Sequence, residues 1–225
     1  MEKTTILSAL LIVYSFCFGQ KDETLLENYP LKINHYNLDL SFDFQEGYLN
    51  GICDVTIENK SDKPVNEIPL LLYRLMKVAS IQNQQGEELE FVQGVVSFSD
   101  FEKLQANSVT INENIKPQSA TTVRIKYEGY LLGYQETGMR YIKDKISPDF
   151  TIIRNDAYSY PILAKPSIAF LRKNIASNNF SYRINITVPD SLMVANGGLL
   201  LLKTSNNKNT TYKYESKKHN SKQNN

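Results

Sequence analysis

The sequence predicts an all-β protein, a saddle-like antiparallel β-sandwich with at most one or two short helices. Three observations predict this class. Apolar and polar residues alternate along many short segments, turn-forming residues separate these segments, and only residues 167–178 have a good helical pattern. Because alternate side chains of a strand point to opposite faces, the alternation indicates sheets that bury one face and expose the other.

The clearest pair of strands lies within residues 36–59. Apolar residues occupy every second position, a short loop with a glycine follows, and the alternation then resumes. Two such segments with a short glycine-containing loop are typical of an antiparallel hairpin. We therefore expect Leu40 and Val55 to point into the core, and Asp39 and Thr56 to point toward solvent.

The remaining elements follow in order, with turn residues between them. The expected strands are residues 33–44, 48–59, 67–73, 77–83, 88–93, 108–115, 121–128, 150–154, 181–188 and 198–203. The expected helix is residues 167–178, and a second short helix is an option at residues 99–106. Residues 211–216 are open to a further strand.

Four consecutive leucines, residues 199–202, stand apart from the alternating strands. Such a run has no polar face, which is typical of a strand that is covered on both sides. Little chain remains after it to supply the second cover. We therefore expect the isolated chain to expose an apolar patch, formed by this run together with Tyr158, Tyr160 and Ile162.

The two ends of the chain differ from the middle. Residues 1–19 are expected to be a signal peptide, because Lys3 precedes an apolar run and small residues stand before a cut at Gln20. The apolar run is short for a membrane span, although an uncleaved anchor is the alternative. Residues 20–214 are expected to form one β-domain, and residues 215–225 a disordered polar tail. The sequence thus predicts export, to the periplasm or the cell exterior, with no integral membrane span after cleavage.

Few residues are able to carry out catalysis. The net charge is +1, which gives no indication of nucleic-acid binding. The two histidines, His35 and His219, are far apart in sequence, whereas a zinc site needs three or four ligands. The motif H-E-x-x-H and the common nucleophile and phosphate-binding motifs do not occur. Cys53 falls on the apolar side of its strand and is expected to be a buried thiol. We expect no catalytic residue and no metal ligand here.

One segment, residues 154–166, combines tyrosines, a charged pair and prolines between expected strands. A rigid loop rich in tyrosine is suited to lining a groove. The alternative is an inter-strand loop whose tyrosines pack into the core.

Three stretches of sequence, residues 29–73, 108–142 and 180–198, carry a resemblance. The residues concerned are Tyr36, Leu38, Leu40, Gly51, Val55, Ile57, Ile68 and Leu70, then Ile111, Val123, Ile125, Tyr127, Gly129, Leu131, Gly138 and Tyr141, and finally Phe180, Ile184, Ile186, Val188, Pro189, Asn196 and Gly197. In this order they resemble the N-terminal domain of aminopeptidase N-like zinc metallopeptidases, the gluzincins. The resemblance covers about residues 29–214.

The resemblance implies a β-domain that packs on a separate zinc catalytic domain and helps to close its substrate cleft. Zinc would belong to that other domain, and peptide substrate would be bound only indirectly. In relatives, a Glu or Gln near this point contacts the substrate amino group, and Asn155 or Asp156 is nearest here. With Tyr158 and Tyr160 they are the substrate-cleft candidates. The usual Asp-Glu-Pro is replaced by residues 164–166, Ala-Lys-Pro, which weakens this transfer.

Two hypotheses follow. The first is an exported N-terminal β-domain of an aminopeptidase N-like metallopeptidase, which is expected to be inactive alone. On this hypothesis the chain is a fragment or a truncated reading frame, and its catalytic domain acts in cis or in trans. The second is a stand-alone exported β-sandwich that binds a peptide, a glycan or a protein partner. The two differ in whether the genomic reading frame continues into H-E-x-x-H.

Overall fold

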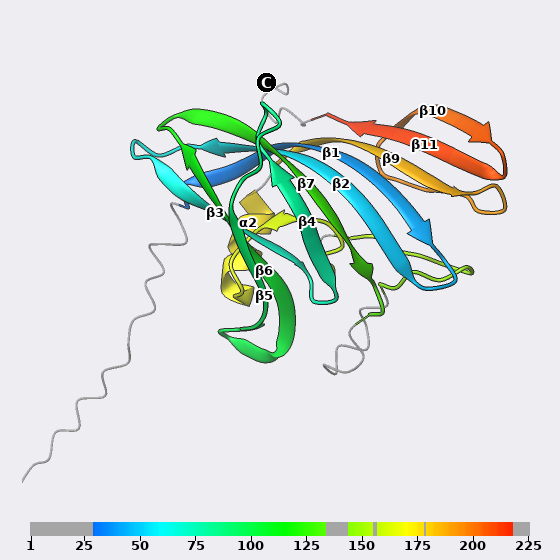
Figure 1. Cartoon of the computed structure of the whole chain (residues 1–225), viewed down its shortest axis with the longest axis horizontal. Helices are drawn as coiled ribbons and strands as arrows, with labels where there is room; N and C mark the ends of the chain where they lie inside the picture. Colours follow the sequence, from blue (N-terminus) through cyan, green and yellow to red (C-terminus); the bar gives the residue numbers. More distant parts are fainter. Residues whose placement is uncertain (1–28, 134–143, 155–156, 178, 218–225) are drawn as a thin grey trace, which may run out of the picture.

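The chain folds into two β-sheets and one helix in the described residues, and the all-β prediction is confirmed (Figure 1). The computed structural model describes residues 29–133, 144–154, 157–177 and 179–217. The expected signal peptide, residues 1–19, lies outside this part of the chain. The described part contains no helix that is both long enough and apolar enough to cross a bilayer.

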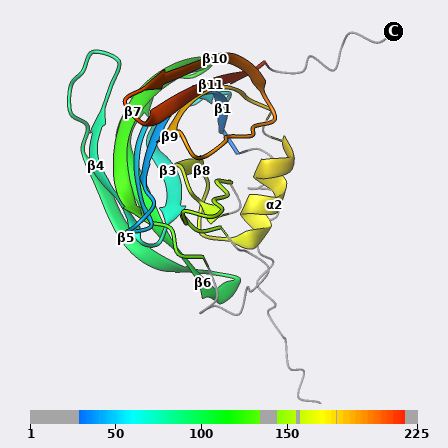
Figure 2. The ribbon, with the colours of Figure 1, turned by 90° about the vertical axis from the view of Figure 1, so that its right-hand side faces the viewer.

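The larger sheet has seven strands in the order β10-β11-β9-β1-β2-β7-β4. Their bounds are β1 Leu31–Asp43, β2 Tyr48–Asn59, β4 Met76–Gln82, β7 Ser119–Tyr130, β9 Ser181–Pro189, β10 Leu199–Asn206 and β11 Asn209–Ser216. The smaller sheet has the order β5-β6-β3-β8, with β3 Val65–Tyr73, β5 Phe91–Phe98, β6 Phe101–Ile115 and β8 Ile162–Leu163. The helix is α2, Ile168–Ser177. The larger sheet forms an arch with β3, β8 and α2 on its concave side (Figure 2).

The pairing in the larger sheet is antiparallel except at one place. Strands β1 and β2 form the predicted hairpin, in which Leu40 lies opposite Gly51. On its other edge β1 pairs in parallel with β9, so that Leu38 lies opposite Ile184. This parallel pair joins the beginning of the described chain to its last third, and it forms the floor of the candidate site described below.

The core lies between the concave face of the larger sheet and the smaller sheet. Leu40 and Val55 are fully buried, whereas Asp39 is exposed and Thr56 is half-buried. The predicted register of the first hairpin is therefore confirmed. Cys53 is also fully buried, as its place on the apolar face predicts.

Two expected elements are not formed. Residues 101–106 belong to β6 and pair with β5, so the option of a helix at residues 99–106 is wrong. This segment is a strand because its backbone N–H and C=O groups form hydrogen bonds with β5 in an antiparallel hairpin. Residues 150–154 are not a strand. The Thr151 hydroxyl closes a local turn with Ser147, which turns this segment away from the sheet.

The predicted helix is confirmed, and its start has a cap from a distant residue. Asp100, in the turn between β5 and β6, accepts hydrogen bonds from the backbone N–H groups of Ile168 and Ala169 at 2.8 and 2.9 Å. A carboxylate at the first turn satisfies N–H groups that lack partners within the helix. The cap therefore fixes α2 to the smaller sheet.

Strand β10 lies at the open edge of the larger sheet. Leu199, Leu200, Leu201 and Leu202 expose 70%, 45%, 44% and 56% of their surface. The leucine run is therefore exposed, as expected. Tyr158 and Ile162, which were expected in the same patch, are instead buried, with 4% and 7% of their surface exposed. Its partner β11 ends at Ser216, and most of the expected polar tail, residues 218–225, lies outside the described part.

Candidate functional site

An apolar groove of about 540 Å³ lies on the inner face of the larger sheet. Its floor is formed by side chains of β1 and β9, which include Leu38, Ile184 and Ile186. One wall is residues 147–153, and the other wall is residues 192–196. The two walls come from segments about 40 residues apart in sequence, which the β-fold brings to opposite sides of the same two strands.

The first wall is held by an ion pair and a closed turn. The side chain of Asp144 is fully buried, and Arg154 donates from Nε to Asp144 Oδ1 at 2.8 Å. The Thr151 hydroxyl donates to the Ser147 carbonyl at 3.1 Å and accepts from the Ser147 N–H at 3.0 Å. The Arg154 side chain is 43% exposed, but its loss would leave the fully buried Asp144 carboxylate without this cation, so the pair anchors the wall. Phe150 lies within the turn and exposes 68% of its surface.

The second wall is attached to the sheet by tyrosine hydroxyl groups. Tyr214 donates to the Val194 carbonyl at 2.7 Å, and Tyr182 donates to Asn196 Oδ1 at 2.7 Å. Between these attachments Met193 exposes 92% of its surface. The wall is thus fixed at both ends while its large apolar side chain projects outward.

One end of the groove is aromatic. The Tyr36 ring contacts the rings of Tyr160 and Phe180 edge-on, with centroids 5.5 and 5.0 Å away. The Tyr36 hydroxyl donates to the Pro161 carbonyl at 2.9 Å, and burial raises its pKa well above the usual value. This hydroxyl therefore stays protonated at neutral pH.

The chemistry of the groove is that of a binding surface. Of the described residues that line it, Asp149 alone carries a charge. A groove with apolar walls and few polar groups is suited to burying apolar surface of a partner.

The residues proposed from sequence for the substrate cleft lie in different surroundings. Tyr160 lines the groove. Tyr158 is buried, with its ring against Phe98 at 5.9 Å and a φ of 54°, which is unusual for a residue with a side chain. Asn155 and Asp156 lie outside the described residues. Their role at a substrate cleft stays a prediction.

Sequence reasoning missed both walls of the groove. The sequence predicts a strand at residues 150–154, and at the second wall it predicts only a turn near Asn196 and the resemblance carried by residues 180–198. At the first wall, Pro148 and Asp149 precede the apolar residues and favour a turn. The second wall has a turn signal at Asn196 and Gly197, but its attachment to the sheet depends on hydrogen bonds from β9 and β11, which the sequence does not reveal.

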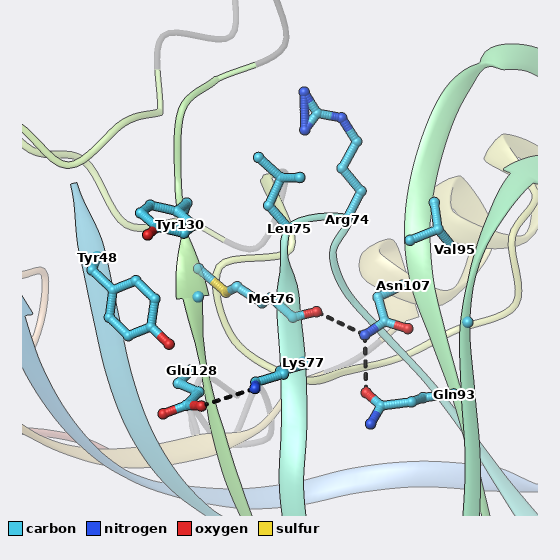
Figure 3. Close-up of a pocket in the computed structure, with 12 residues that line it drawn as sticks. Tyr48, Arg74, Leu75, Met76, Lys77, Gln93, Val95, Asn107, Glu128 and Tyr130 are labelled. Carbon is cyan, nitrogen blue, oxygen red and sulfur yellow. Dashed lines mark hydrogen bonds and ion pairs between the residues drawn. The ribbon is translucent and has the colours of Figure 1, made fainter. Parts of the chain in front are cut away.

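A second hollow, of about 490 Å³, lies between β4 and β5 (Figure 3). The Asn107 side-chain amide donates to the Met76 carbonyl at 2.7 Å and to Gln93 Oε1 at 3.1 Å. Lys77 pairs with Glu128 at 3.4 Å between the neighbouring strands β4 and β7, as a dashed line in Figure 3 shows. Gln93 and Asn107 thus join the smaller sheet to β4 of the larger sheet. We therefore assign these polar side chains of the hollow a structural role.

The described residues do not provide a ligand set for zinc. No three His, Cys, Asp or Glu side chains in the described part lie close enough to share a metal ion. His35 Nδ1 lies 2.8 Å from the Ser181 hydroxyl, and burial together with Arg183 lowers its pKa. Burial raises the pKa of the Cys53 thiol well above its usual value. The residues of this part of the chain are therefore not assigned to any zinc-dependent step.

Comparisons with known proteins find relatives through structure. No protein-family model and no curated protein sequence matches the chain. The M1 zinc metallopeptidase from Deinococcus radiodurans matches with a TM-score of 0.59 and 19% identity, over 84% of this chain and 39% of that chain. A mutant of that enzyme matches with a TM-score of 0.59 and 20% identity, over 83% of this chain and 39% of that chain.

A further solved structure is described as a two-domain M1 zinc metallopeptidase mutant bound to L-arginine. It matches with a TM-score of 0.58 and 20% identity, over 84% of this chain and 39% of that chain. This chain therefore spans well under half of the solved chains that it matches. At this level of identity the likeness concerns the fold alone. The β-fold of this chain is thus the fold of one part of the M1 zinc metallopeptidases, and the resemblance noted in the sequence is confirmed as a resemblance of fold.

Proposed function

We propose that this chain is the exported N-terminal β-domain of an M1-type zinc metallopeptidase. Its role is to pack on a zinc-bearing catalytic domain and to limit access to the substrate cleft. The single observation that carries the proposal is the structural match over 84% of this chain to 39% of an M1 zinc metallopeptidase chain. The three sequence stretches that carry the resemblance, residues 29–73, 108–142 and 180–198, lie mostly in the described fold.

The proposed mechanism assigns no chemical step to this chain. In a zinc peptidase, the metal polarises the peptide carbonyl and activates water. The residues of this chain would supply a rigid wall beside that site. The two anchored sides of the groove, Asp144–Arg154 and the tyrosine-bound residues 192–196, support such a role, because a wall that excludes large substrates must not yield.

A stand-alone exported binding module is the second candidate function. The apolar groove favours it, because a groove of about 540 Å³ has the size of a small-molecule or peptide site. A complex with a peptide or glycan, formed without any peptidase domain, would support this candidate.

The first test is catalytic. We expect the purified chain to hydrolyse no aminoacyl reporter substrate and to contain no stoichiometric zinc by metal analysis, because its described residues offer no ligand set. Hydrolysis that a chelator abolishes would contradict the proposal.

The second test concerns the partner. The part of the D. radiodurans M1 zinc metallopeptidase outside the match is produced as a separate protein and titrated with this chain in a calorimeter. We expect a saturable complex, with a small β-sandwich of unrelated fold as the control. The proposal fails if no complex forms with this probe or with any zinc peptidase domain encoded beside the gene.

A further inference from the structure

We propose that the apolar groove, with Phe150 and Met193 at its mouth, is the surface on which the zinc-bearing domain docks. This inference rests on the proposed function, since it names the surface that the partner would cover. It goes further because it assigns the contact to two side chains. It also distinguishes the groove from the leucine strand, which is another exposed apolar surface.

The exposed side chains at the groove are the first argument. Phe150 and Met193 stand on opposite walls and expose 68% and 92% of their surface, although both are large and apolar. Aromatic residues and methionine are enriched in protein interfaces, and a few such anchors supply most of the binding energy. Two anchors on either side of an apolar floor form a surface for another protein rather than an enclosed pocket.

The rigidity of both walls is the second argument. Phe150 is held by the turn between Ser147 and Thr151, and this turn lies beside the buried Asp144–Arg154 pair. Met193 lies between two points that tyrosine hydroxyl groups attach to the sheet. A wall whose backbone is already fixed loses little backbone entropy when it binds, which favours association.

The nature of the occupant follows from the matched structures. They include a chain described as a two-domain M1 zinc metallopeptidase, and the match covers 39% of it. Such a chain therefore carries a second domain joined to the part that this protein resembles. Domains in one chain commonly share an interface of about 600–1,500 Å². The groove is suited to an apolar part of that interface, because Asp149 is its one charged residue among the described lining.

The leucine strand is less suited to this role. Its four leucines lie at the edge of the larger sheet and are exposed on both faces, so they offer no concave surface. The strand β10 also carries a register shift between Leu200 and Leu202. A bulge increases the local twist of a strand, so the four leucines do not form one flat docking face.

The test is a titration of the full chain with the D. radiodurans zinc domain described above. The double variant Phe150→Ser, Met193→Lys is compared with the wild-type chain and with Val92→Lys. Val92 exposes 72% of its surface on β5, outside the groove, and is the matched control for placing a lysine at an exposed apolar position. Circular dichroism and the melting temperature of each variant check that the sheet is intact.

We expect the double variant to bind at least about tenfold more weakly, and Val92→Lys to bind like the wild-type chain. If the wild-type chain binds and the double variant binds equally well, the groove assignment is wrong while the proposed function stands. If the wild-type chain binds neither this domain nor a zinc peptidase domain encoded beside its own gene, the proposed function itself fails. A loss of binding on Leu200→Lys instead of the double variant would transfer the docking surface to β10 and overturn the inference.

Discussion

Neighbouring residues of β1 differ sharply in what they contribute to stability. Leu40 is fully buried and Asp39 is exposed, because adjacent side chains of a strand point to opposite faces. We expect Leu40→Ala to lower the free energy of unfolding by about 2–5 kcal/mol, through lost burial and a cavity. Asp39→Ala should change it by no more than about 0.5 kcal/mol. Urea denaturation of both variants measures the difference, and equal losses would show that the register is wrong.

Cys53 offers a second test at the level of a single residue. Its thiol is fully buried, and burial raises its pKa well above the usual value, since the thiolate would lie in an apolar core. We therefore expect the thiol to stay protonated and unreactive in the folded chain up to at least pH 8.

The measurement is labelling with a coloured disulfide reagent, in a chain that lacks residues 1–19 and hence Cys17. The folded protein should not react within minutes at pH 8, whereas the protein in denaturant should react completely. Rapid labelling of the folded chain would mean that Cys53 is accessible, and that the face of β2 assigned to the core is open to solvent.

At the level of elements, the close approach of β7 and β4 depends on a glycine. Gly129 has a φ of 152°, and a Cβ at this position would overlap the Leu75 carbonyl oxygen and Met76 Cα. Both obstacles are backbone atoms, so they cannot rotate away. We expect Gly129→Ala to destabilise the chain by more than about 1 kcal/mol, because both its conformation and its contacts are unfavourable.

Gly94→Ala on β5 is the matched control. A Cβ at Gly94 meets no atom within 4 Å, so the same chemical change has free space. Thermal melting of the two variants should give a clear decrease for Gly129→Ala and little change for Gly94→Ala. Equal melting temperatures would contradict the tight packing of β7 on the turn that precedes β4.

Elements that the sequence predicted well are those with strictly local patterns. The hairpin of β1 and β2 and the helix α2 follow from alternation and helical spacing. The pattern at residues 99–106 does not distinguish a helix from a strand. The segment is a strand because residues 101–106 pair with β5. Tertiary contacts commonly override a weak local preference in this way.

For the whole molecule, the leucine strand predicts self-association. Leu199 to Leu202 expose between 44% and 70% of their surface at an open sheet edge. Exposed apolar edges favour pairing between chains. We expect the folded chain from Gln20 onward to bind a hydrophobic dye and to elute from a sizing column as more than a monomer at high concentration.

The double variant Leu200→Lys, Leu202→Lys should reduce both effects without loss of circular dichroism. Thr204→Lys is the control, because it adds a charge to the same exposed strand without removing apolar surface. A wild-type chain that stays monomeric and binds no dye would contradict this prediction, and it would favour the stand-alone binding module over the domain of a larger enzyme.

The sequence by itself determined the class of the fold, the face of the first hairpin that is buried, the helix at residues 167–178 and the absence of known catalytic motifs. These features depend on residues close together in the chain, where a period of two or of 3.6 is readable. The sequence also placed Tyr160 in a segment suited to a groove, but it did not identify residues 147–153 and 192–196 as the walls of that groove.

Only the tertiary structure decided the parallel pairing of β1 with β9 and the position of the groove. The floor joins strands about 145 residues apart, and the walls depend on the Asp144–Arg154 pair and on the hydroxyl groups of Tyr182 and Tyr214. Contacts at such separations leave no periodic signal in the sequence, because each is set by the packing of the whole sheet. For the same reason, the exposure of Phe150 and Met193 could be known only once both walls were in place.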